Sequence, residues 1–193
     1  MLAHRGRAAQ AREGAANLAQ ISLARGEGLV ASFVQAQPCI VELALGNYRE
    51  ALAAAQEVFA ADPPDLGIKL LPDLVEAACR AGEEKTAAMG LARLRQRASA
   101  SGTPWAPGLL ARAQAILADD DDDDDDGEAE DLYREALTEL SRTEAAVDLA
   151  RAHLLYGEWL RRQCRRRDAR GQLRTAHESL TRWAPTRSPS VHE

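Results

Sequence analysis

The sequence has 193 residues, of which 46% are hydrophobic and 28% charged, and this is the balance of a folded globular chain. Aromatic residues make up only 4%, which argues against an aromatic platform for stacking nucleic-acid bases. The net charge of −6 is local, because eight consecutive aspartates from Asp119 to Asp126 supply −8 and leave about +2 for the rest (−6 + 8).

Helix-forming residues dominate the sequence and alternating strand patterns are almost missing, so we expect an all-α fold. Proline and glycine divide the chain. The DPPD segment at residues 62–65 stops one helix, because proline lacks an N–H. At a later helix boundary, Gly102 is expected to end one helix, Thr103 to cap the N-terminus of the following helix, and Pro104 to be its first residue. The expected helices cover residues 8–24, 28–45, 48–61, 67–81, 84–100, 105–118, 128–142, 146–163 and 166–183.

Four segments of the chain superimpose as repeats, beginning at Gly46, Gly82, Asp124 and Cys164. Each has a small residue five positions after its start, followed by further core candidates four and then three residues later. This i, i+4, i+7 spacing places the three positions on one face of a helix. The positions are Ala51, Ala55 and Val58; Ala87, Leu91 and Leu94; Ala129, Tyr133 and Ala136; and Ala169, Leu173 and Ala176. One helix pair cannot bury its face alone, so we expect stacked antiparallel pairs.

The pattern resembles the tetratricopeptide repeat. In the first copy Gly46, Tyr48, Ala51 and Pro63 stand where that motif has its Gly, Tyr, Ala and terminal Pro, and in the last copy Gly157 matches the small residue of the first helix. The small positions recur every 36, 42 and 40 residues (51, 87, 129 and 169), which exceeds the usual period of about 34. The resemblance implies a right-handed superhelix with a concave face.

A closer resemblance lies in residues 148–180, which read DLARAHLLYGEWLRRQCRRRDARGQLRTAHESL. They are similar to the helical-repeat region of large ATP-binding transcriptional regulators of the LuxR type, most specifically over residues 150–162, and the likeness extends over about residues 25–183. In that family a P-loop ATPase precedes the repeats and a helix-turn-helix domain follows them. This chain has no GxxxxGK[ST] sequence and ends at Glu193, where the DNA-reading domain would begin. We therefore expect DNA as a partner only through a helix-turn-helix domain absent from this chain.

The domain organisation follows from these patterns. We expect residues 1–24 to form an N-terminal helix or partial repeat, residues 25–184 to form tetratricopeptide-like repeats with an acidic loop at residues 119–127, and residues 185–193 to form a flexible tail. The N-terminus lacks the apolar core of a signal peptide, and no run approaches the ~18 apolar residues of a membrane span. A cytoplasmic protein without a membrane partner is the expectation.

The aspartate run invites a metal-binding interpretation, because part of it spells the start of an EF-hand loop. Asp122 would be the first position of that loop, but the twelfth, which needs a bidentate Glu, is Tyr133. We therefore interpret residues 119–126 as a solvated loop expansion, with weak cation association or acidic recognition as alternatives. Shortening the run to two aspartates is expected to leave fold and stability nearly unchanged.

An arginine cluster occupies residues 161–167. It is interpreted as a helix end and a solvated turn, since cations suit a helix C-terminus. The alternative is an electrostatic contact with nucleic-acid phosphate, an acidic partner or the chain's own aspartate loop. Cys164 lies in this turn and is the cysteine to test for reactivity, whereas Cys39 and Cys79 are expected to be structural, because the three are odd in number and have no CxxC pairing.

The remaining chemistry-bearing residues have structural interpretations. Trp105, Trp159 and Trp183 are expected to pack between repeats, and His153 and His177 lack a third ligand for a metal site. No catalytic, cofactor-binding or metal residue is assigned, since no catalytic motif occurs, and the chain is not expected to be an enzyme.

The leading functional hypothesis is a sensor or interaction module of a LuxR-type regulator that binds a protein or small-molecule effector on the concave surface. A free-standing tetratricopeptide-like adaptor is the second hypothesis, and nucleic-acid binding through the arginine-rich end is the third. Isolated repeats lack their neighbours, so self-association through an uncapped apolar face is a further expectation.

Overall fold

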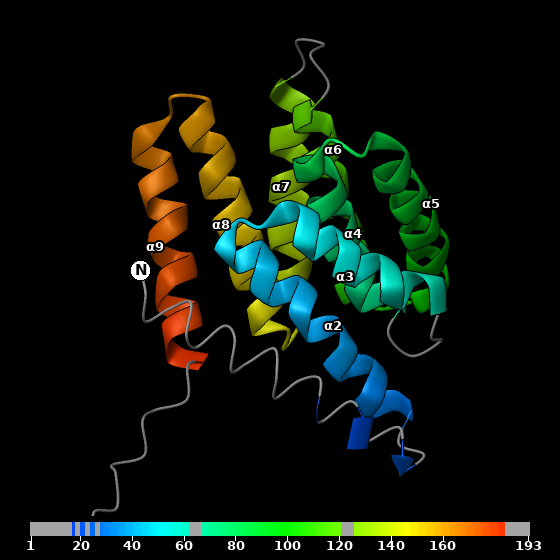
Figure 1. Cartoon of the computed structure of the whole chain (residues 1–193). Coiled ribbons are helices and arrows are strands. Elements are labelled where there is room, and N and C mark those ends of the chain that lie inside the picture. The colour runs from blue at the N-terminus through cyan, green and yellow to red at the C-terminus, as the bar shows by residue number, and fades with distance from the viewer. Residues whose placement is uncertain are drawn as a thin grey trace, which may run out of the picture. The chain divides into compact units, whose positions relative to one another are not determined.

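The computed structural model describes residues 17, 20–21, 24–25, 28–61, 67–120 and 126–183. In this part of the chain the elements are helices and none is a strand, which confirms the expected all-α class (Figure 1). None of these described helices is long and apolar enough to cross a membrane. The helices are α2 (Gly28–Leu45), α3 (Tyr48–Ala61), α4 (Gly67–Ala81), α5 (Glu84–Ser101), α6 (Trp105–Asp120), α7 (Asp126–Ser141), α8 (Ala146–Arg162) and α9 (Arg166–Trp183).

The expected helix boundaries agree with the observed ones to within two residues. The largest differences flank the aspartate run, where α6 continues to Asp120 and α7 already begins at Asp126. The middle of the predicted acidic loop, residues 121–125, lies outside the described residues, as do the DPPD segment and the predicted tail. Of the expected helix at 8–24, the described residues 17, 20, 21 and 24 are helical. Helix α6 begins at Trp105, as the expected range 105–118 has it, so Pro104 directly precedes the helix and is not its first residue.

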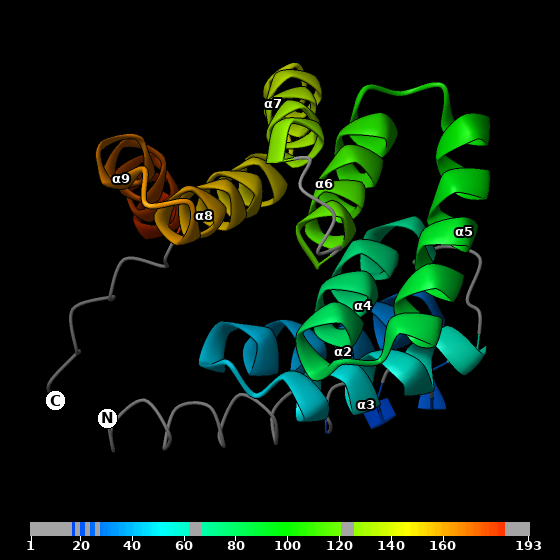
Figure 2. The same cartoon turned by 90° about the horizontal axis from the view of Figure 1, so that it is seen from above.

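The chain divides into two compact units. The first comprises residues 1–102 with residues 116–121, and the second comprises residues 103–115 with residues 122–193. In the first unit, α2, α3, α4 and α5 pack against one another in chain order. In the second, α8 packs against both α7 and α9, and α8 and α9 run antiparallel side by side in both views (Figures 1 and 2).

Three of the turns between paired helices have the same backbone geometry. Gly46, Gly82 and Cys164 adopt the left-handed conformation, with φ of 76°, 76° and 58°. In each turn the N–H of that residue donates to the carbonyl three residues earlier, and the next N–H donates to the carbonyl five residues before it. This is the Schellman motif, which satisfies the last carbonyls of the first helix. The equivalent residue of the remaining copy, Asp124, lies outside the described residues.

The small positions found in the sequence lie inside the fold. Ala51, Ala87, Ala129 and Ala169 are each at most 2% exposed, and each is the fourth residue of its helix. The positions seven residues further on are also buried, being Val58, Leu94, Ala136 and Ala176. The repeat register therefore predicted correctly which face of each second helix is buried.

Close approach between helices depends on glycine at three places. A Cβ added to Gly157 of α8 would lie 2.8 Å from Cγ of Leu173 in α9. A Cβ on Gly108 of α6 would lie 2.8 Å from Cγ of Leu140 in α7, and one on Gly90 of α5 would lie 3.1 Å from Val75 in α4. A leucine or valine side chain thus occupies the space that a larger residue would need, and this sets how near the two helices come.

Candidate functional site: the Glu130 network and its aromatic layer

The carboxylate of Glu130 on α7 is the centre of a polar network in the second unit. Its Oε1 accepts a hydrogen bond from the Tyr156 hydroxyl of α8 at 2.7 Å. The same oxygen lies 2.8 Å from Nη1 of Arg165 and accepts a 2.8 Å bond from Nη2 of Arg134. The Glu130 side chain is only 16% exposed, so these contacts are partly shielded from solvent. One oxygen therefore joins α7, α8 and the turn that leads into α9.

The local fold explains how these groups meet. Glu130 and Arg134 are one helical turn apart on α7, which is the spacing of a favourable i, i+4 pair. Arg165 belongs to the turn between α8 and α9, and its N–H donates to the carbonyl of Leu160 at 2.9 Å. The guanidinium of Arg165 also contacts Asp168 at 3.0 Å, so its position is set from both sides.

Three aromatic rings lie beneath the network. The rings of Tyr133 and Tyr156 stack with centroids 5.4 Å apart, and each lies 6.0 Å from Trp159. All three side chains are at most 5% exposed. Such offset aromatic contacts add about 0.5–1.5 kcal/mol per pair beyond the burial itself. The rings fix the direction of the Tyr156 hydroxyl, and so they position the donor that Glu130 accepts from.

The network shifts the ionisation of its members in opposite directions. Burial raises the pKa of Glu130, but the hydrogen bonds from Tyr156 and Arg165 and the charges of Arg134 and Arg165 outweigh it, so the pKa falls below its ordinary value. Burial, together with the hydrogen bond to Glu130, raises the pKa of Tyr156 above its ordinary value. The site therefore holds a carboxylate anion and a neutral phenol. A carboxylate stabilised in this way is a weak proton acceptor, and its three contacts favour a role in joining helices.

A second polar contact joins α6 to α8 within the same unit. Nε1 of Trp105 donates to Oδ2 of Asp148 at 2.9 Å, and the buried Arg112 guanidinium lies 3.9 Å from Oδ1. The Trp105 ring packs against the core cluster of Leu109, Leu140 and Ala152. Trp105 thus combines apolar packing with a directional bond to a carboxylate.

The tryptophans expected in the core behave as packing residues where the structure describes them. Trp159 is 2% exposed and Trp105 is half-buried, while the Trp183 side chain lies outside the described part of the chain. Tyr133, the residue in the twelfth position of the EF-hand spelling, is buried in the aromatic layer at 1% exposure. It occupies the place of the carboxylate that an EF-hand needs.

The histidines and cysteines singled out in the sequence lie in different environments in the structure. Nδ1 of His153 lies 2.6 Å from the amide oxygen of Gln172, whereas His177 is exposed on α9. Among the described residues no three metal-capable side chains come together. Cys39 is buried, Cys79 is half-buried and Cys164 is exposed.

The arginine cluster divides by position. Arg161, Arg162, Arg166 and Arg167 are exposed, and Arg165 takes part in the Glu130 network. A contact of this cluster with the aspartate loop was one of the alternatives that the sequence left open, whereas its contact with Glu130, and the role of Tyr156, were not predicted. The sequence contains one indication of this contact. Glu130 directly follows the repeat position Ala129, and Arg165 precedes the equivalent position, Ala169, by four residues.

No known family model matches the chain, and no curated protein or solved structure matches it either.

Proposed function

We propose that the chain is a helical-repeat interaction module that binds a protein or small effector and carries out no chemistry itself. The observation that supports this proposal is the recurrence of one hairpin unit: the same left-handed turn, followed five residues later by a buried alanine, at Ala51, Ala87 and Ala169. Recurrent hairpins of this kind build extended surfaces, which repeat proteins use for binding.

The finer form of the proposal is the sensor region of a LuxR-type regulator. The segment most like that family, residues 150–162, falls entirely within α8. Its buried residues include Leu155, Tyr156, Trp159 and Leu160. The similarity therefore concerns residues that pack the helices, and it supports a shared architecture more directly than a shared ligand.

The genetic context tests the regulator against the adaptor. If the proposal is correct, the DNA flanking the coding region encodes a P-loop ATPase upstream and a helix-turn-helix downstream. Absence of both would reject the regulator and leave the free-standing adaptor as the function to pursue.

The binding role itself can be tested by site-specific photo-cross-linking in the native cell. A cross-linker replaces Met89 or Val147, which are 61% and 50% exposed and are the kind of side chain that a partner buries. Lys85, an exposed charged residue, serves as the control position. A single cross-linked species obtained from an apolar position and not from Lys85 supports the module, and no species from any exposed helix face would refute it.

A further inference from the structure

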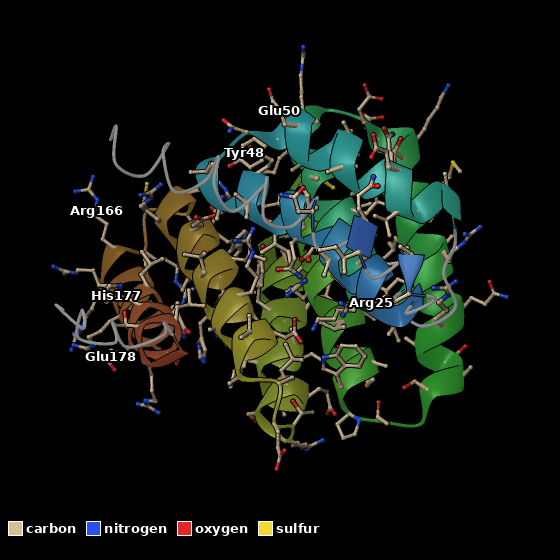
Figure 3. All side chains as sticks on the ribbon, turned by 60° about the horizontal axis from the view of Figure 1, so that its bottom comes forward. Arg25, Tyr48, Glu50, Arg166, His177 and Glu178 are labelled. Carbon is tan, nitrogen blue, oxygen red and sulfur yellow. The ribbon has the colours of Figure 1, made fainter. Side chains whose placement is uncertain are left out.

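The outward face of α9 carries an unusual concentration of arginine. The inward face of the helix is marked by Ala169 and Ala176, which are at most 2% exposed. Figure 3 shows Arg166, His177 and Glu178 projecting away from the α8–α9 pair. The exposed arginines of α9 are Arg166, Arg167, Arg170, Arg174 and Arg182.

These five arginines have no ion-pair partner among the residues that the structure describes, in contrast to Arg165. Helix α9 contains two acidic residues, and one of them, Asp168, is already held by Arg165 at 3.0 Å. Glu178 is the remaining acid. The face therefore presents five guanidinium groups against one carboxylate, and intramolecular contacts within the described chain do not neutralise them.

The arginines are spread around the helix and do not form a narrow stripe. At 3.6 residues per turn, the positions from Arg166 to Arg182 cover an arc of about 160° and a length of about 24 Å. Because the arginines lie on both sides of the exposed helix face, they can contact a ligand that carries negative charge on both sides of the helix. The major groove of a nucleic-acid duplex is wide enough for an α-helix and has phosphates along both edges.

We propose that the outward face of α9 binds the phosphate backbone of double-stranded nucleic acid without reading its sequence. Arginine is suited to this contact because its planar guanidinium donates two parallel hydrogen bonds to a phosphate. A lipid surface fits less well, since Gly171 and Thr181 lie among the arginines and the exposed Leu180 at the edge of the face is a small apolar area for insertion into a membrane. An extended acidic peptide would contact a narrower arc. This inference stands independently of the proposed function.

The test measures binding of a fluorescent duplex of random sequence by anisotropy between 50 and 200 mM salt. In the variant Arg167→Ala, Arg170→Ala, Arg174→Ala, affinity at 50 mM salt falls more than tenfold. The slope of log K against log salt is negative, and it becomes shallower by about 2.7, because each of the three lost phosphate contacts removes about 0.9 from its magnitude. Alanine at exposed helix positions preserves folding, which circular dichroism checks. The matching Arg→Lys variant keeps most of the slope.

A matched control carries Arg25→Ala, Arg49→Ala and Arg95→Ala, which are exposed positions of the first unit, and it changes the net charge by the same amount. If the proposal is right, the affinity of this control variant for the duplex at 50 mM salt falls less than threefold. An equal loss in both variants would mean that only overall charge acts, and absence of wild-type binding at 50 mM salt would overturn the site. Binding to anionic vesicles or polyaspartate that is lost in the α9 variant, while duplex binding is retained, would assign the face to that other partner.

Discussion

Replacing Cys164 by glycine is expected to stabilise the protein. Cys164 is the one described non-glycine residue with positive φ, at 58°, and it stands where the two equivalent turns have Gly46 and Gly82. Its side chain is exposed, so the substitution removes no core packing. The backbone bonds of the turn, from Cys164 N–H to Arg161 at 3.2 Å and from Arg165 N–H to Leu160 at 2.9 Å, are available to glycine as well.

The size of the effect follows from two opposing terms. A side chain in the left-handed region costs roughly 1–2 kcal/mol. Glycine makes the unfolded chain more flexible, which offsets about 0.4–1 kcal/mol of the gain. The net stabilisation is therefore on the order of 0.5–1 kcal/mol. For a chain of this size that raises the midpoint of thermal unfolding by about 1–4 °C.

Urea unfolding followed by circular dichroism measures the change, with Cys164→Ala as the control. Alanine removes the thiol but keeps the Cβ, so it should give no comparable gain. The reciprocal variant Gly82→Ala should lose about 0.5–1 kcal/mol through its backbone alone, because an added Cβ there meets nothing within 4 Å. If Cys164→Gly destabilises, or if Cys164→Ala gains as much, then left-handed strain is not the cause.

The other predictions concern close packing and the polar network. Gly157→Ala places a Cβ 2.8 Å from a leucine of α9 and should cost about 1–3 kcal/mol, whereas Gly171→Ala, with nothing within 4 Å, should gain up to about 1 kcal/mol in the same urea titration. Because the pKa of Glu130 is lowered, its stabilising contribution is present above pH 4.5 and is lost as pH falls below that value. Glu130→Gln should therefore be less stable than wild type at pH 7 by about 1–3 kcal/mol, a gap that narrows in acid; a constant gap would contradict this. The raised pKa of Tyr156 makes its contribution present below pH 10 and lost above it, which alkaline unfolding with absorbance detection measures. Trp105→Phe removes a bond to a carboxylate and should cost about 1.5–3 kcal/mol in urea, and a loss below 0.5 kcal/mol would show that the bond is unimportant.

Helices and their buried faces were predictable because their causes are local. Gly46 and Gly82 mark turns that need positive φ, and Gly102 ends α5 with φ of 63°. The buried alanine of each repeat lies five residues after the first residue of that repeat, so the repeat spacing alone predicts it. Cys164 carries no such signal in its residue type, yet its place in the repeat, five residues before Ala169, was enough to align it with the glycines.

The polar network was not predictable, because its partners are remote in sequence. Glu130 and Tyr156 are 26 residues apart, and Trp105 and Asp148 are 43 apart. Nothing in the neighbourhood of Trp105 indicates that its ring nitrogen needs an acceptor from α8. Such pairs depend on the angle and distance between helices, and the glycines that set those distances were recognised in sequence only at Gly157.

The shared turn has a consequence for how this chain could have diverged. Two to three residues between paired helices, with one left-handed residue, determine how the second helix returns along the first. A hairpin encoded so compactly can be duplicated or lost as a single piece, and its two helices can change surface residues without losing their mutual alignment. Changes in the length of the connections and helix ends would give uneven periods such as 36, 42 and 40 residues without altering such a turn, because longer surface connections cost little stability.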